Sequence, residues 1–140
     1  MATFNKFNSF VEAVAEKVHN LGTDTLKVML SNTLPVNTNA IKTDITEIAA
    51  GNGYTAGGNT ATQSSSAQTG GTYKLVLNDP AAFTATGGSI ATFRYAVLYN
   101  STATNGELIG WWDYGSAVSL AVGDSFTVDF DPTTGVLTLA

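Results

Sequence analysis

Cysteine is absent from this chain of 140 residues, and charged residues are scarce. Without a thiol, the protein can have neither thiol catalysis nor a thiolate metal site, and its fold must form without disulfides. Asp, Glu, Lys and Arg make up 12% of the residues, about half of the usual share of roughly 25%. With a net charge of −5 we expect no nucleic-acid partner, because such partners are bound through basic surfaces.

Long apolar runs are also missing. The start of the chain, MATFNKFN, contains no apolar h-region, and no later run approaches the roughly 20 residues that a membrane-spanning helix needs. We therefore expect a protein that is made and folded in a cytosol and has no membrane partner. The length predicts a single domain that buries roughly two-thirds of the surface of its unfolded chain.

Reactive side chains do not form a recognisable constellation. The one histidine, His19, falls in the last turn of a predicted helix, where the helix dipole explains it. No Gly-x-Ser-x-Gly elbow accompanies it. The run Gly51–Gly58 suggests a phosphate cradle, but no Gly-Lys-Ser/Thr follows it, so we interpret it as a structural loop. We expect no enzyme activity and no cofactor.

Two groups of acidic residues allow other hypotheses. Asp124, Asp129 and Asp131 are close enough in sequence to hold a calcium ion at the rim of a sheet, although solvated charges at strand ends explain them more simply. Glu107 and Asp113 flank an aromatic strand, a spacing that paired carboxylates for glycoside chemistry also allow. Such coincidences are common among eleven scattered acidic residues.

The N-terminal segment, residues 1–22, has the pattern of an amphipathic helix. Its apolar residues recur at spacings of three and four and are Phe4, Phe7, Val11, Val14, Val18 and Leu21. The spacing predicts a helix over about 4–20, capped by Thr3 or by Ser9 with Glu12, and ended by Gly22. This helix packs either on the sheet of its own domain or against another subunit.

Residues 23–140 are predicted to form an antiparallel β-sandwich, jelly roll or small barrel. Its centre is a hairpin of Phe93–Tyr99 and Leu108–Tyr114, joined by a loop that ends in Asn105-Gly106. Further strands are predicted at Thr25–Leu30, Thr60–Thr69 (an edge strand), Tyr73–Leu77, Phe83–Thr86, Val118–Leu120, Ser125–Phe130 and Val136–Leu139. Ile41–Ile48 fits a helical turn and a strand equally well.

Trp111 and Trp112 are adjacent, so in a strand their side chains point to opposite faces. Only one of them can enter a given core; the other is partly exposed, paired with the helix or buried in an interface. Tryptophan is enriched in the energetic centres of interfaces. Together with Phe4 and Phe7 near the N-terminus, these residues are our candidates for an assembly interface.

Several stretches resemble a family of small virion proteins of tailed bacteriophages. The similarity covers nearly the whole chain and lies in FNKF at 4–7, KVHNLGTDTLKV at 17–28, ITEIAAGNGYTAGG at 45–58, TYKLV at 72–76, FRYAVLYN at 93–100, LIGWWDYG at 108–115 and DSFTVDF at 124–130. Those members that have a role look like capsid decoration, or cement, proteins. The resemblance carries no family site residue onto this chain.

The resemblance implies a structural role on the outside of a phage head, clamping neighbouring capsomers. It implies that the protein is made in the cytoplasm of the bacterial host, binds the major capsid protein and associates with itself, as a trimer. Such a role needs rigidity and adhesive surface rather than reactive groups. The alternative from another class is a carbohydrate-binding or host-attachment module of a fibre or tail that uses an exposed tryptophan.

Overall fold

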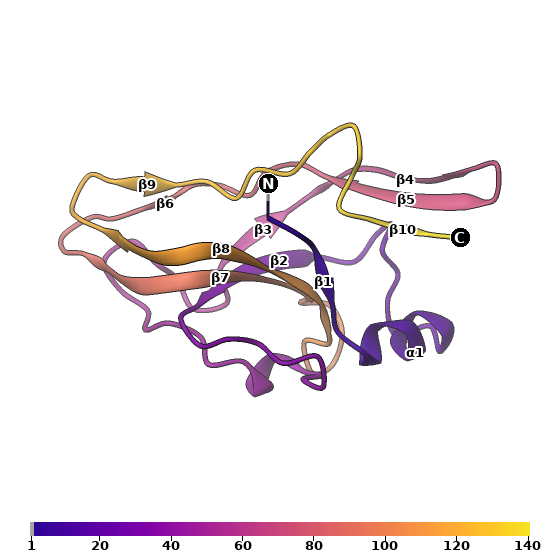
Figure 1. The fold of residues 1–140 in the computed structure, drawn as a ribbon, viewed down its shortest axis with the longest axis horizontal. Helices are drawn as coiled ribbons and strands as arrows, with labels where there is room; N and C mark the ends of the chain where they lie inside the picture. Colours follow the sequence, from indigo (N-terminus) through magenta and orange to yellow (C-terminus); the bar gives the residue numbers. More distant parts are fainter. Residues whose placement is uncertain (1) are drawn as a thin grey trace.

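The computed structural model describes residues 2–140 and shows a protein built mainly of antiparallel strands, with one short helix (Figure 1). In chain order the elements are β1 (Asn5–Lys6), α1 (Ser9–Ala15), β2 (Leu26–Ser31), a 3-10 turn (Lys42–Asp44), β3 (Asn59–Ala61), β4 (Gln63–Thr69), β5 (Thr72–Leu77), β6 (Phe83–Thr84), β7 (Ile90–Asn100), β8 (Leu108–Leu120), β9 (Ser125–Phe126) and β10 (Leu137–Leu139). No helix among these residues is long and apolar enough to cross a bilayer.

The predicted central hairpin is confirmed. β7 and β8 pair antiparallel in the middle of a five-stranded sheet of order β1-β8-β7-β2-β3. Gly106 has a φ of 65°, which is the left-handed conformation that glycine adopts readily in such a loop. β7 is covered on both faces, as its apolar residues at successive positions required.

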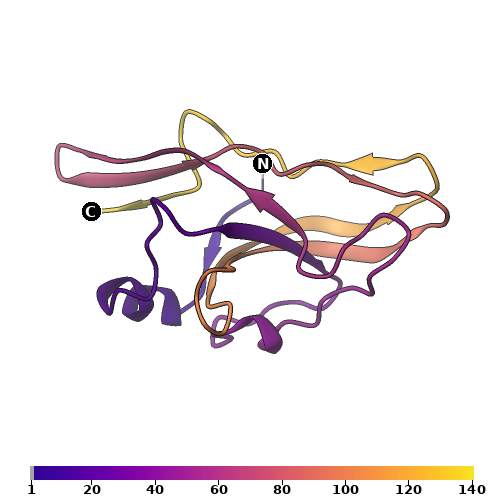
Figure 2. The same cartoon turned by 180° about the vertical axis from the view of Figure 1, so that it is seen from behind.

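The remaining strands form a second layer. A three-stranded sheet, β10-β5-β4, and a two-stranded one, β6-β9, lie across one face of the five-stranded sheet (Figures 1 and 2). Leu75 of β5 and Leu137 of β10 pack in one core with Val28 of β2 and Leu98 of β7. The main core therefore lies between the two layers.

The opposite face of the five-stranded sheet has a core of its own. Phe7, Met29, Val97 and Trp111 pack there with Ile45, which comes from the connection between β2 and β3. Of the two alternatives that Ile41–Ile48 allowed, the helical turn is present at Lys42–Asp44, and no continuous strand forms there. The connection also has isolated bridges, Ser31 to Glu47 and Ile41 to Glu107, that tie it to the sheet.

The predicted helix over 4–20 is too long at both ends. Asn5 and Lys6 pair with Trp111 and Gly110 as strand β1, so this part of the chain gives its backbone hydrogen bonds to the sheet. The helix begins at Ser9, and its N-cap is Asn8. The two predicted N-caps, Thr3 and Ser9, do not have this role. It packs on the sheet of its own chain, because Phe10 lies in the core between the layers.

The helix also ends before the predicted glycine. Lys17 adopts the left-handed conformation with a φ of 65°. The amide of Val18 donates to the carbonyl of Ala13 at 2.8 Å, and the amide of Lys17 to that of Val14 at 3.3 Å, which is the Schellman pattern. Lys17 thus takes the position that a glycine usually fills, and Gly22 has no part in the cap.

Three predicted strands differ from the structure. The predicted edge strand Thr60–Thr69 is divided into β3, which pairs with β2, and β4, which pairs with β5. Val118–Leu120 is not separate but forms the end of β8, beyond a bulge: Tyr95 pairs with Asp113 and Phe93 with Val118, so residues 114–117 have no partner in β7. The predicted strand Ser125–Phe130 pairs only at Ser125–Phe126. Beyond it the chain leaves the sheet, and the amide of Phe130 donates to the Asp79 carboxylate at 2.7 Å.

Candidate functional site

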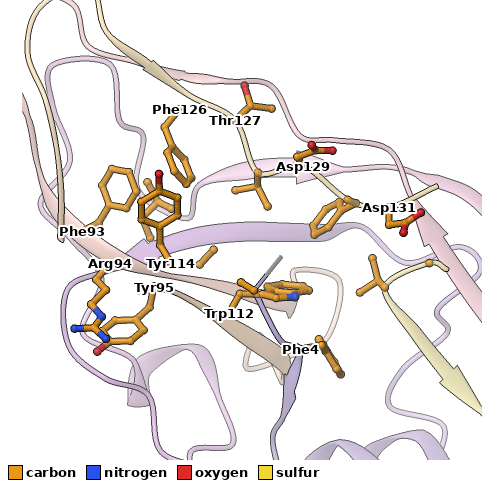
Figure 3. Close-up of a pocket in the computed structure, with 17 residues that line it drawn as sticks. Phe4, Phe93, Arg94, Tyr95, Trp112, Tyr114, Phe126, Thr127, Asp129 and Asp131 are labelled. Carbon is orange, nitrogen blue, oxygen red and sulfur yellow. The ribbon is translucent and has the colours of Figure 1, made fainter. Parts of the chain in front are cut away.

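A groove of about 470 Å³ lies between the β7–β8 hairpin and the segment that follows β9 (Figure 3). Its lining is unusually rich in aromatic rings, which come from the N-terminus, from both strands of the hairpin and from the covering segment. These residues are Phe4, Phe93, Tyr95, Trp112, Tyr114, Phe126 and Phe130. Cavities of this size and apolar character are the usual form of a ligand or peptide site.

Trp112 forms the floor of the groove. Its ring lies between Phe4, at a centroid distance of 5.3 Å, and Phe130, at 5.4 Å. Phe4 reaches this place because Gly110, its neighbour on β8, has no side chain: a Cβ on Gly110 would overlap the Phe4 ring. The pairing of β1 with β8 therefore positions Phe4 at the groove, and the absence of a side chain at Gly110 leaves space for its ring.

Tyr114 is the most exposed ring of the groove, with 58% of its surface accessible. It meets Phe126 edge-on at 5.4 Å (Figure 3). The bulge in β8 is held by Asp113, whose carboxylate accepts from the Arg94 guanidinium at 2.7 and 2.9 Å and from the Gly115 amide at 2.8 Å. These hydrogen bonds, that of Arg94 first, lower the pKa of Asp113, so the carboxylate that shapes this part of the groove stays ionised.

The four predicted interface residues divide between two places. Phe4 and Trp112 lie in the groove and are partly buried. Phe7 is wholly buried in the core on the opposite face, and Trp111 is 9% exposed there, edge-on to Tyr95. The two tryptophans point to opposite faces, as predicted. Phe7 and Trp111 therefore have almost no surface to offer to a partner in this conformation.

The acidic hypotheses find no matching arrangement. Among residues 2–140, no three acidic or histidine side chains gather in a way that could hold a metal ion. Asp124 accepts from the Ala121 amide, and Asp131 from the amides of Thr133 and Thr134, so these carboxylates stabilise turns. Asp113 is engaged by Arg94, and Glu107 accepts from Asn105, so each of these carboxylates has a local partner of its own.

The glycine-rich loop is a structural loop closed by Glu47. The Glu47 carboxylate accepts from the Tyr54 hydroxyl at 2.7 Å and from the Gly57 amide, and Lys42 lies 3.2 Å from it. The Tyr54 hydroxyl accepts in turn from the Leu30 amide of β2 at 3.1 Å. The Gly57 amide, which a phosphate would need as a donor, already donates to the Glu47 carboxylate. This argues against an anion cradle.

His19 is not at a helix end, and the helix-dipole explanation for it is wrong. It is buried behind α1, where the Asn100 side-chain amide lies 3.1 Å from its Nδ1 and donates to Asp24 at 2.6 Å. Burial lowers the pKa of His19, and the nearby carboxylates of Glu107 and Asp24 oppose this only in part. A proton on Nδ1 would face the NH₂ group of Asn100, so the folded protein holds this histidine neutral.

We expect the free energy of unfolding to fall between pH 7.5 and 5.5. The unfolded chain binds a proton at His19 near pH 6.5, whereas the folded chain, with its lowered pKa, does not. The contribution of His19 to stability is therefore full well above pH 6.5 and declines as the pH falls through 6.5, until the folded pKa is reached. His19 is the only histidine, so urea unfolding of His19→Gln across this range should show a flatter slope. An unchanged slope would contradict this explanation.

Comparison of the chain with protein-family models, with curated proteins and with solved structures found no match. Function must therefore be argued from the residues and from the groove.

Proposed function

We propose that the protein is a virion structural protein of a tailed bacteriophage, a capsid decoration or cement protein that binds the outside of the head and stabilises contacts between capsomers. Its partners would be the major capsid protein and other copies of itself, in a trimer, and it would be made in the cytoplasm of the host. The resemblance in sequence supports the role. Two packed β layers, which we propose form a flattened sandwich of the jelly-roll kind, would supply the rigidity it needs.

The observation that carries the proposal is the aromatic groove. Phe4, Trp112, Tyr114 and Phe126 are partly or largely exposed within it, while the carboxylates of Asp129 and Asp131 lie at its rim (Figure 3). An aromatic centre with a polar rim is the usual composition of a protein interface. The groove would be the surface that meets the shell.

We expect Tyr114→Ala to weaken binding to phage heads at least about 10-fold, the loss of a moderate interface anchor. Tyr114 is largely exposed, so its removal should leave thermal unfolding nearly unchanged. The matched control is Val122→Ala, which removes another apolar side chain with 64% exposure that does not line the groove. Binding is measured by co-sedimentation of purified protein with heads stripped of it.

Salt separates this mode of binding from charge attraction. With 6 basic and 11 acidic residues, the chain has little long-range charge to steer it, so heads should rebind the protein at both low and high ionic strength. Coated heads should also resist heat better, because a ligand that binds only the assembled shell stabilises it. Heads that neither bind the protein nor gain stability would overturn the proposal.

The second candidate is carbohydrate binding, which Trp112 and Tyr114 favour because their rings stand in a groove large enough for a sugar. Glycan titration should then quench tryptophan fluorescence. Since Trp111 is buried on the other face, Trp112→Phe should abolish the quenching and Trp111→Phe should preserve it. A saturable glycan response, with heads that do not bind the protein, would favour this candidate.

A further inference from the structure

The hairpin of β4 and β5 forms an arm that extends past the other strands at one end of the molecule (Figures 1 and 2). Its turn, Gly70-Gly71, has φ values of 59° and 86°, which is the two-residue type I′ geometry that matches the twist of paired strands. Ser64–Thr69 are all exposed. The arm is therefore a regular, well-formed hairpin with one side open to solvent.

The open side is an unprotected strand edge. Within residues 2–140, β4 pairs with β5 alone, so the outward backbone amides and carbonyls of β4 have no strand partner. Folded proteins normally protect such edges with lysine, proline or charge. Gln63–Thr69, QSSSAQT, contains none of these. Its one irregularity lies at the base, between Gln63 and Ser65, and from Ser65 to Thr69 the strand pairs with β5 in an unbroken register.

Side chains of the arm form hydrogen bonds within the chain, but these bonds do not involve the open backbone edge of β4. The Gln63 amide donates to the carbonyls of Leu21 and Asp24 at 2.9 and 2.8 Å, and the Ser66 hydroxyl bonds the Tyr73 hydroxyl at 2.8 Å. Ser66 pairs with Leu75, which is buried in the main core, so these contacts lie on the inner face. None of them covers the edge itself.

We infer that β4 pairs antiparallel with β4 of a second copy of this chain, around a two-fold axis near Ser66, so that two three-stranded sheets join into one. A two-fold contact places a strand opposite itself, where like charges would repel each other. β4 has no charged residue and only small or uncharged side chains, so it is compatible with itself in this register. This two-fold contact lies on a different surface from the groove, is a separate contact from that of the proposed trimer, and does not depend on the proposed function.

The absence of native cysteine makes the pairing directly measurable. Opposite Cα atoms of antiparallel strands lie about 4.5–5.5 Å apart, within the roughly 4.4–6.8 Å that a disulfide spans. Single cysteines placed at positions 64 to 68 and oxidised mildly should give disulfide dimers most efficiently at Ser66→Cys. A mixture of Ser65→Cys and Ala67→Cys should form more dimer than either alone. Val122→Cys, which is also exposed but distant in sequence, measures random collision.

A second pair of variants keeps the test independent of cysteine chemistry. Ala67→Lys adds a charge to the open edge and should reduce the dimer fraction in sedimentation at high concentration, with partial recovery in high salt. Thr72→Lys adds the same charge on β5, away from the edge, and should not. Cross-linking that nowhere exceeds that of Val122→Cys would overturn the inference, as would equal dimer fractions for the two lysine variants.

Discussion

Phe7→Ala should lower the free energy of unfolding by about 3–5 kcal/mol, the range for truncating a fully buried phenylalanine. Phe7 has no exposed surface and packs with Met29 and Val97, and its amide donates to the Ile109 carbonyl at 3.3 Å. Removing the ring leaves a cavity beneath the central strands. Because domains have only about 5–15 kcal/mol of net stability, this loss is a large part of the whole. Urea unfolding monitored by circular dichroism measures it.

The control for this prediction is Val11→Ala, which lies in the same N-terminal segment but is 50% exposed on α1. Its effect should stay within about 0.5 kcal/mol. If Phe7 instead served as an interface anchor, Phe7→Ala would leave the unfolding of dilute protein unchanged and reduce self-association. By the same argument, deletion of residues 1–10 should abolish folding, because it removes both Phe7 and Phe10.

The sequence was sufficient to predict the elements that depend on neighbours along the chain. The alternation in Phe93–Tyr99 and the Asn105-Gly106 loop predict β7, β8 and their pairing. The N-terminus could not be predicted in the same way, because the residues that turn Asn5 and Lys6 into a strand are Trp111 and Gly110, roughly a hundred positions away. Helical spacing there is real, but long-range pairing of the backbone overrides it.

The candidate site shows the same division. That Trp111 and Trp112 face opposite sides follows from strand geometry. Strand geometry does not tell which tryptophan borders a groove. That depends on Phe4, which occupies the space left by Gly110, and on the segment after β9, which leaves the sheet at Phe126. Tyr114 offered one signal, its place at the end of an aromatic strand, but the bulge fixed by Arg94 and Asp113 was not visible in the pattern.

Gly58→Ala should be among the most damaging single-methyl additions in this protein, with an expected cost above about 3 kcal/mol from backbone strain and overpacking together. Gly58 has a φ of 71°, and a Cβ there would overlap the Val28 carbonyl and approach Met29 Cα to 2.8 Å. These are backbone atoms of β2, which is paired on both sides with β3 and β7 and so has no freedom to move. The loop 51–58 needs a glycine at its end because Gly58 lies directly against the backbone of β2.

Gly87→Ala separates the two contributions to this cost. Gly87 has nearly the same φ, 73°, but no atom lies within 4 Å of a Cβ built on it, so only the strain of about 1–2 kcal/mol should remain. Unfolding of both variants in urea, with the native spectrum checked first, gives the difference, which is the cost of the overlap with β2. Equal losses for Gly58→Ala and Gly87→Ala would mean that β2 yields to the added methyl group and that close packing does not explain the glycine.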